Sequence, residues 1–288
     1  MQQRPFRQID VFSHHPGFGN PVAVVLDAQG LSDADMRRFA AWTNLSETTF
    51  LMPPTAAGHA AGADYRLRIF SPRGELPFAG HPTLGTCRAW LQQGHTPRVP
   101  GLVVQESAQG LVQIEHQGDT LAFAAPPLQC SKPSPALVPL VASALGLRPH
   151  QIRATQLLDN GPVWLGLLLD SADTVLGLTP DHARLKDLGQ DVGVIHIAPD
   201  AGDNPERPGA VVRAFAAPMG NPEDPVTGSL NASLAQWLIA EGLAPTRYLV
   251  AQGECLGRAG RVYIRQDAQG QVWVGGHTVT CIEGTALL

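Results

Sequence analysis

The sequence has little charge, few cysteines and no long apolar run. Only 16% of its 288 residues are charged, against 44% hydrophobic, and the formal net charge is −5. This balance excludes a disordered chain and predicts a sizeable core. Clusters of Lys and Arg are absent from an acidic chain, which excludes a general binder of nucleic acid or of anionic membranes.

Signals for secretion or membrane insertion are also missing. The first residues contain no apolar core typical of a signal peptide, and the apolar stretch near residues 163–169 is much shorter than the ~20 residues that span a bilayer. The cysteines are widely spaced and form no C-x-x-C pair, which disfavours a zinc ribbon or a disulfide framework. We predict a soluble, cytoplasmic protein with reduced thiols.

Common cofactor and nucleophile motifs are absent. The sequence contains no H-E-x-x-H, no Gly-rich P-loop with Lys and no G-x-S-x-G elbow. Residues 17–21 (GFGNP) begin like a dinucleotide loop but lack its third glycine, and we expect His14 and His15 to lie in a surface turn. We therefore expect neither a nucleotide site in residues 17–21 nor a metal site at His14 and His15.

The length suits two domains or one large one. Residues 126–135 contain four prolines, which suit a linker better than a strand or a helix. We predict an N-terminal domain at 1–125, a Pro-rich linker at 126–135 and a C-terminal domain at 136–288, whose last strand could return to the first domain.

Several local elements can be predicted directly. Ser32 and Asp35 form a capping box ahead of a helix that continues to about Leu45. Residues 47–52 follow as a strand, with Glu47 at its start. Residues 261–265 and 271–274 are typical of a hairpin joined by an Ala-Gln-Gly turn.

The most informative feature is an internal repeat. Residues 81–86 (HPTLGT) and 224–229 (DPVTGS) share the pattern [H/D]-P-x-x-G-[T/S], and a helical run containing Trp-Leu follows each. Two copies of one fold explain this economically. The alternative, that both motifs only cap buried helices, is less favoured because both copies carry a titratable group at the same place.

The repeated pattern predicts two helix entrances. Proline suits the first helical position, which would make Asp224 a good N-cap and His81 a less common one. Backbone N–H groups at Gly85–Thr86 and at Gly228–Ser229 would then be open to an anion. If the two halves pack as pseudo-symmetric partners, both entrances could face one cleft that holds a small carboxylate substrate.

At these residues the sequence resembles the PhzF family of phenazine-biosynthesis-like isomerases. The similar blocks extend over nearly the whole chain and include residues 19–21, 44–48, 75–85, 223–229, 252–258 and 274–276. The resemblance implies an α+β fold of the diaminopimelate-epimerase type. This fold has two pseudo-symmetric domains, each a mostly antiparallel sheet curled around a central helix. The resemblance also implies a homodimer that needs no cofactor.

The resemblance also implies the site residues and the activity. Glu47 matches the general acid/base of the family, His81 and Asp224 match its active-site His and Asp, and Ser229 matches its helix-entrance Ser, with Gly80 beside His81. A carboxylate shielded from water can take and return a proton near neutral pH. We expect an isomerase that moves a proton on a small carboxylate-bearing substrate.

Other functions stay open at this point. An epimerase or racemase could use Glu47 without thiols, and a metabolite-binding protein could use the same scaffold. The two-thiol racemases of this fold have a cysteine where this chain has Ala79, which makes two-thiol racemisation improbable. Glu75 could be a second active-site carboxylate or a member of an ion pair.

Overall fold

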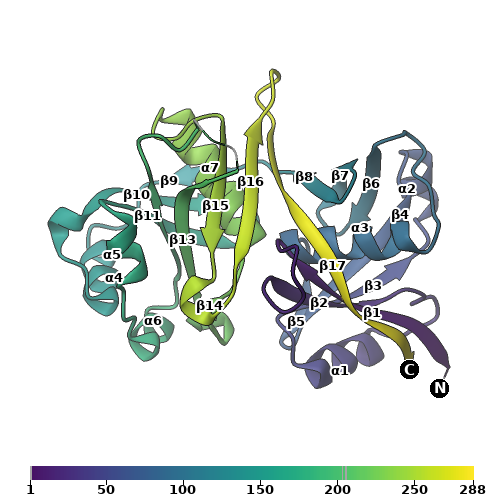
Figure 1. The fold of residues 1–288 in the computed structure, drawn as a ribbon. Coiled ribbons are helices and arrows are strands. Elements are labelled where there is room, and N and C mark those ends of the chain that lie inside the picture. The colour runs from purple at the N-terminus through teal and green to yellow at the C-terminus, as the bar shows by residue number, and fades with distance from the viewer. Residues whose placement is uncertain (1, 203, 205) are drawn as a thin grey trace. The chain divides into compact units, whose positions relative to one another are not determined.

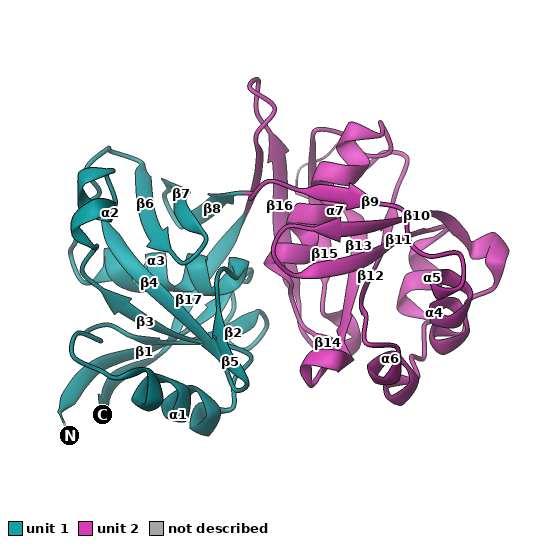
Figure 2. Cartoon of the chain, turned by 180° about the vertical axis from the view of Figure 1, so that it is seen from behind, with its two compact units in different colours: residues 1–124, 275–288 teal, residues 125–274 magenta. Residues whose placement is uncertain are grey.

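The computed structural model describes residues 2–202, 204 and 206–288, which form two compact units (Figure 2). Unit 1 comprises the chain up to Ala124 together with Gly275–Leu288, and unit 2 comprises Ala125–Val274. The long strand β17 (Val272–Leu287) therefore begins in unit 2 and ends in unit 1.

Unit 1 is a closed β-barrel (Figure 1). Its elements are β1 (Gln3–Val11), β2 (Asn20–Val25), α1 (Asp33–Thr43), β3 (Thr48–Met52), α2 (Ala56–Ala60), β4 (Tyr65–Ser71), β5 (Gly74–Leu76), α3 (Gly80–Gln92), β6 (Leu102–Ser107), β7 (Gly110–Gln117) and β8 (Thr120–Ala124). The strands pair in the order β17–β1–β2–β3–β4–β6–β7–β8, and β8 closes the ring onto β17. The pairs β2–β3 and β4–β6 are parallel and the others with a described register are antiparallel.

Helix α3 is enclosed by this barrel. Every residue from Gly80 to Trp90 is buried, as expected of a helix that contacts its neighbours on all sides. Gly85 allows the closest approach, because a Cβ at this position would lie 2.3 Å from Cγ1 of Val22 on β2.

A smaller apolar cluster lies between the sheet and α1. Met36 and Ala40 of α1 pack against Val25, Phe50 and Phe70. The helix begins with the predicted capping box, in which the Ser32 hydroxyl accepts from the backbone N–H of Asp35. This local prediction is confirmed.

Unit 2 repeats the strand order of unit 1. Its elements are β9 (Gln129–Ser131), α4 (Leu137–Leu145), β10 (Ile152–Asp159), β11 (Val163–Leu169), α5 (Ala172–Leu176), α6 (His182–Leu188), β12 (Asp191–Ile197), β13 (Pro208–Ala216), β14 (Asn221–Asp224), α7 (Gly228–Ala240), β15 (Arg247–Gln252) and β16 (Gly260–Gln266), with short 3₁₀ turns at Pro149–Gln151, Ala217–Met219 and Glu254–Leu256. The pairing order is β9–β10–β11–β12–β13–β15–β16, and β11–β12 and β13–β15 are parallel, as are their counterparts in unit 1. The predicted class, an α+β fold of two pseudo-symmetric domains, is confirmed.

Two faces of the unit 2 sheet are covered by helices. On one face, Val192 and Val194 of β12 join an apolar cluster with residues of α4, α5 and α6. On the other face lies the buried helix α7, which takes the place of α3. The predicted hairpin is also present, as β16 and the first residues of β17 around a turn closed by Asp267 and Gln271.

The predicted Pro-rich linker contains a strand. β9 pairs with β10 through residues 129–131 of the segment 126–135. None of the four prolines lies within these three residues, so the ladder does not have to accommodate a missing N–H.

The two units achieve close helix–sheet packing in opposite ways. In unit 1 the glycine is on the helix, where Gly85 faces Val22. In unit 2 the glycine is on the strand, where a Cβ on Gly193 of β12 would lie 2.2 Å from a methyl carbon of Leu230 on α7. In each contact, a large side chain therefore packs against a glycine, which has no side chain.

In the described part of the chain, no helix is long and apolar enough to cross a membrane.

Substitution of Gly85 by Ala should destabilise unit 1. The new methyl group would meet Val22, whose branched side chain has few alternative rotamers. We expect the free energy of unfolding to fall by about 1–2 kcal/mol, although replacing a mid-helix glycine alone would raise it by roughly 1 kcal/mol. Urea unfolding measures the difference.

Gly284→Ala is the matched control, because no atom lies within 4 Å of a Cβ at that position. It should change stability by less than about 0.5 kcal/mol. In a Val22→Ala background Gly85→Ala should destabilise less, with only the looser contact to Cγ2 of Val11 at 3.2 Å remaining, and an undiminished loss there would contradict the assignment of the contact.

Candidate functional site

The entrance of α3 is formed by Ala79, Gly80 and His81. Ala79 is the N-cap, with an extended backbone, and offers no side-chain cap to the first-turn N–H groups. His81 is the second residue of the helix rather than its cap, so the prediction that His81 caps a helix starting at Pro82 is wrong. The helix starts earlier because the N–H of Thr83 already bonds to the carbonyl of Ala79.

His81 and Glu47 lie together beside this entrance. Glu47 immediately precedes β3, and its Oε2 lies 3.4 Å from Nε2 of His81. Both side chains are shielded, with 6% of the His81 side chain and 17% of the Glu47 side chain exposed. The structure thus brings together two of the three predicted catalytic residues.

The buried imidazole of His81 is held neutral. Burial lowers its pKa from the usual 6.5 to about 3, and a hydrogen bond to the backbone of Pro21 offsets this only in part. At neutral pH the ring therefore carries no charge that would fix Glu47 as its counter-ion.

Gly85 and Thr86 do not lie at a helix entrance. Both are inside α3, where backbone N–H groups bond along the helix and are closed to an anion. Gly85 packs against β2, and the Thr86 hydroxyl donates to Oγ1 of Thr49 at 2.8 Å. The prediction that they bind substrate through open amides is wrong.

The entrance of α7 is formed by Thr227, Gly228 and Ser229. Thr227 is the N-cap and Gly228 the first helical residue, so Gly228 and Ser229 occupy the places of Gly80 and His81. Asp224 is not an N-cap as predicted. It ends β14, where it pairs with Ala214 of β13.

A buried glutamine explains why α7 begins late. Gln252 accepts from the N–H of Thr227 at 3.1 Å through Oε1, and its Nε2 donates to the carbonyl of Asp224 at 3.2 Å. These bonds hold the chain between Asp224 and Thr227 outside the helix. The amide of Asn231 also donates to Oε1 of Gln252, at 2.8 Å.

The same network fixes the carboxylate of Asp224. The Thr227 hydroxyl donates to Oδ2 at 2.5 Å, and the amide of Asn221 donates to Oδ1 at 3.2 Å. Nε2 of Gln252 supports Thr227 by donating to its hydroxyl at 3.0 Å. With both oxygens accepting hydrogen bonds, Asp224 is oriented as a hydrogen-bond acceptor.

Unit 1 has a corresponding glutamine that the sequence did not reveal. Gln105 of β6 is fully buried, donates to the Thr83 hydroxyl at 3.1 Å and accepts from the Tyr65 hydroxyl at 3.0 Å. In unit 1 the glutamine lies on β6, which is parallel to β4, and in unit 2 it lies on β15, which is parallel to β13. Equivalent strands therefore place a glutamine against the start of the enclosed helix in each unit. Gln252 lay within a block of family resemblance, whereas Gln105 carried no signal.

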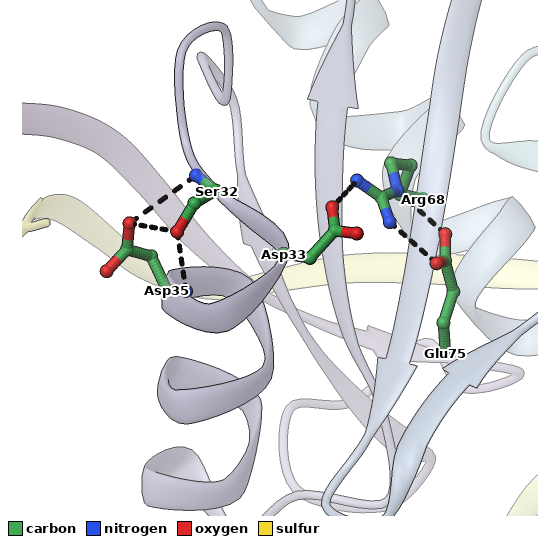
Figure 3. A network of polar contacts seen from close by, with 5 residues as sticks. All are labelled: Ser32, Asp33, Asp35, Arg68 and Glu75. Atoms are coloured by element: carbon green, nitrogen blue, oxygen red, sulfur yellow. Dashed lines mark hydrogen bonds and ion pairs between the residues drawn. The ribbon is translucent and has the colours of Figure 1, made fainter.

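Glu75 is a member of an ion-pair network (Figure 3). Its carboxylate binds Arg68 through two bonds of 2.7 and 2.6 Å, and Arg68 also binds Asp33 at 2.6 Å. Figure 3 shows Arg68 between the two carboxylates, next to the capping box of α1. This geometry supports a structural role for Glu75.

No group of three or more His, Cys, Asp or Glu side chains suited to a metal ion occurs among the described residues. The four thiols are free; Cys87 is buried and the other three are exposed.

Comparison with known proteins gives consistent matches over nearly the full length. A family model described as phenazine biosynthesis-like protein matches residues 9–284. The chain is 35% identical to antisense-enhancing sequence 1 of Schizosaccharomyces pombe, with all of both chains covered. It is 33% identical to trans-2,3-dihydro-3-hydroxyanthranilate isomerase of Pseudomonas aeruginosa, over 97% of this chain and 98% of that protein.

A solved structure also matches. The PhzF-family phenazine biosynthesis protein of Bacillus anthracis superposes with a TM-score of 0.82 at 22% identity, covering all of both chains. At this identity the match bears on the fold alone.

Truncation of Gln252 to Ala should destabilise unit 2. It would leave the Thr227 N–H, the Asn231 amide and the Asp224 carbonyl without this partner in a buried setting. Each such group costs about 1–3 kcal/mol, so we expect the free energy of unfolding to fall by at least ~3 kcal/mol. Gln29→Ala, at an exposed position, should change it by less than about 0.5 kcal/mol. Equal effects of the two substitutions in urea unfolding would contradict the network.

Proposed function

Because the chain belongs to the phenazine biosynthesis-like (PhzF) family, we propose that it is a cofactor-independent isomerase that moves a proton on a small carboxylate-bearing substrate. Its isomerase class is the class named for several of its relatives. The residues at the α3 entrance support the proposed substrate class and a proton transfer that needs no cofactor.

The pair formed by Glu47 and His81 carries the proposal. A carboxyl group that removes a proton from carbon and returns it elsewhere must change its protonation state during each turnover. The neutral ring of His81 permits this, since a protonated imidazole at 3.4 Å would favour the ionised carboxylate throughout. We assign the proton transfer to Glu47, and we assign to His81 the role of orienting the Glu47 carboxyl group.

The helix entrance suits the carboxylate of a substrate. First-turn N–H groups at Gly80 and His81 attract an anion, and Ala79 supplies no competing side-chain cap. Asp224, Gly228 and Ser229 of unit 2 keep the site roles that the resemblance implies, as predictions.

The helix entrances argue against two-thiol chemistry. The residues that precede them are Ala79 and Thr227, neither of which carries a thiol. Cys87 lies deep in α3, where burial raises its pKa to about 12. A thiolate base is therefore disfavoured at these positions.

Replacement of Glu47 by Gln should abolish proton transfer. The amide keeps the shape of the side chain and removes the titratable group, so we expect the rate to fall at least ~10²-fold while folding is preserved. Deuterium incorporation from heavy water into product measures the step. The compound in the name of the Pseudomonas relative is the first substrate to test, followed by other cyclic carboxylates.

Glu75→Gln is the matched control, because it makes the same change at the Arg68 ion pair. Its rate of deuterium incorporation should stay near that of the wild type. A Glu47→Gln variant with the wild-type rate would overturn the assignment. A wild-type protein that binds such a carboxylate without any exchange would favour a binding protein over an isomerase.

The stability of the protein should depend on pH through His81. Between its usual pKa of 6.5 and its folded pKa of about 3, the unfolded chain binds a proton that the folded protein excludes. The free energy of unfolding should therefore fall as the pH falls through this range, by about 1.4 kcal/mol per pH unit from this residue. Urea unfolding of His81→Gln across the same range should lack this component. Identical pH slopes for variant and wild type would contradict a buried, neutral imidazole.

A further inference from the structure

A small polar cavity lies in unit 1, apart from the helix entrance. It has a volume of about 270 Å³, and it is lined by residues of α3, of β17, of the loop after β1 and by Asp119 of the turn between β7 and β8. Pockets for drug-sized ligands usually measure about 300–1,000 Å³, so this cavity suits a smaller occupant. The features that decide its chemistry are Arg88 with its ion-pair partner Asp119, a pair of histidine rings in contact, and Thr278.

The guanidinium of Arg88 is buried, and the carboxylate with which it forms an ion pair, that of Asp119, is exposed. Only 10% of its side chain is exposed, and the carboxylate of Asp119, 3.7 Å from Nη1, is itself 89% exposed. Two N–H groups of Arg88 are already used, by the Thr278 hydroxyl and the Asp119 carbonyl, each at 2.7 Å. A carboxylate that lies mostly in water compensates a buried cation weakly, which leaves the guanidinium suited to an anion in the cavity.

Two imidazoles complete the wall. The rings of His14 and His277 lie against each other, with centroids 3.4 Å apart and planes tilted by 30°. Phe12, two residues before His14, has a positive φ of 66° that bulky side chains rarely adopt. Its ring is fully buried and its N–H donates to the carbonyl of His277 at 2.8 Å. Backbone strain of this kind is concentrated at ligand sites, and here it turns the loop so that His14 lies over His277.

We propose that this cavity binds a phosphate group. Arg88, the Thr278 hydroxyl and the two imidazoles offer donors from different directions, which suits an anion with several oxygens better than a planar carboxylate. Arg88 follows His81 by seven residues on α3, a rise of about 10 Å along the helix. The site is thus separate from the α3 entrance and independent of the proposed function.

Calorimetric titration of the full chain with inorganic phosphate, methyl phosphate and acetate tests this. We expect saturable binding of a phosphate and weaker binding of acetate. Tighter binding of inorganic phosphate would identify the free ion as the occupant, and tighter binding of methyl phosphate would identify a phosphate ester.

Three variants locate the binding. Arg88→Gln should weaken phosphate binding at least tenfold, because it removes charge-assisted donors. Asp119→Asn should strengthen binding, because it removes a negative charge beside the anion. Arg38→Gln, which removes an exposed arginine from α1, should leave the affinity unchanged.

His277→Gln provides a second loss variant if Arg88→Gln does not fold, and it should also weaken binding. Three results would overturn the proposal: no saturable phosphate binding, acetate binding as tight as phosphate, or affinities that do not respond to the cavity variants. The last would place the anion elsewhere, for example at the α3 entrance, where Arg88→Gln has no direct effect.

Discussion

In both units a helix is enclosed by strands of the same unit, and its first turn must satisfy its polar groups largely without water. The first N–H groups of any helix lack partners within the helix. In α3 and α7 the residue at the N-cap gives no side-chain cap, so these amides stay available to an external acceptor. Enclosure of the helix and an anion-attracting entrance are consequences of one packing arrangement.

This arrangement also explains the buried glutamines. A side chain that both donates and accepts can serve several buried groups at a helix start from one strand position. Gln252 bonds to Thr227, Asn231 and Asp224, whereas Gln105 bonds only to Thr83 and Tyr65 within the described interactions. The glutamine with more partners, Gln252, lies beside the residues between β14 and α7, which it holds outside the helix.

Much of the fold was predictable from local patterns. The capping box at Ser32 and the hairpin before the C-terminus rest on residues close in sequence, where spacing and turn chemistry determine structure. The duplication rests on two short motifs, each of which is local. The pairing of His81 with Glu47 followed from family resemblance, because no local pattern links two residues on different elements. Strand β9 was missed because proline content describes the segment and not the three residues between the prolines.

The repeated motif predicted the right helices with the wrong alignment. Matching the Pro and Gly letters aligns His81 with Asp224, but the helix starts align Gly80 with Gly228 and His81 with Ser229. The letter match could not show this, because Gln252, a residue distant in sequence, delays the start of α7. The prediction that Gly85 lies at a helix entrance is wrong for a related reason. The sequence does not distinguish a glycine that allows close packing from one at a helix entrance.

The corrected alignment shows that the two units differ in the side chains at equivalent positions beside the helix entrances. β12 takes the place of β3, each lying parallel to the second strand of a hairpin, and the residues just before them are Gln190 and Glu47. The Gln190 amide donates to two backbone carbonyls and cannot act as a base. At equivalent places unit 1 therefore has a carboxyl and an imidazole, and unit 2 has an amide and the hydroxyl of Ser229. Duplication has therefore kept the backbone positions at the two helix entrances, while the side chains there differ in whether they can exchange a proton.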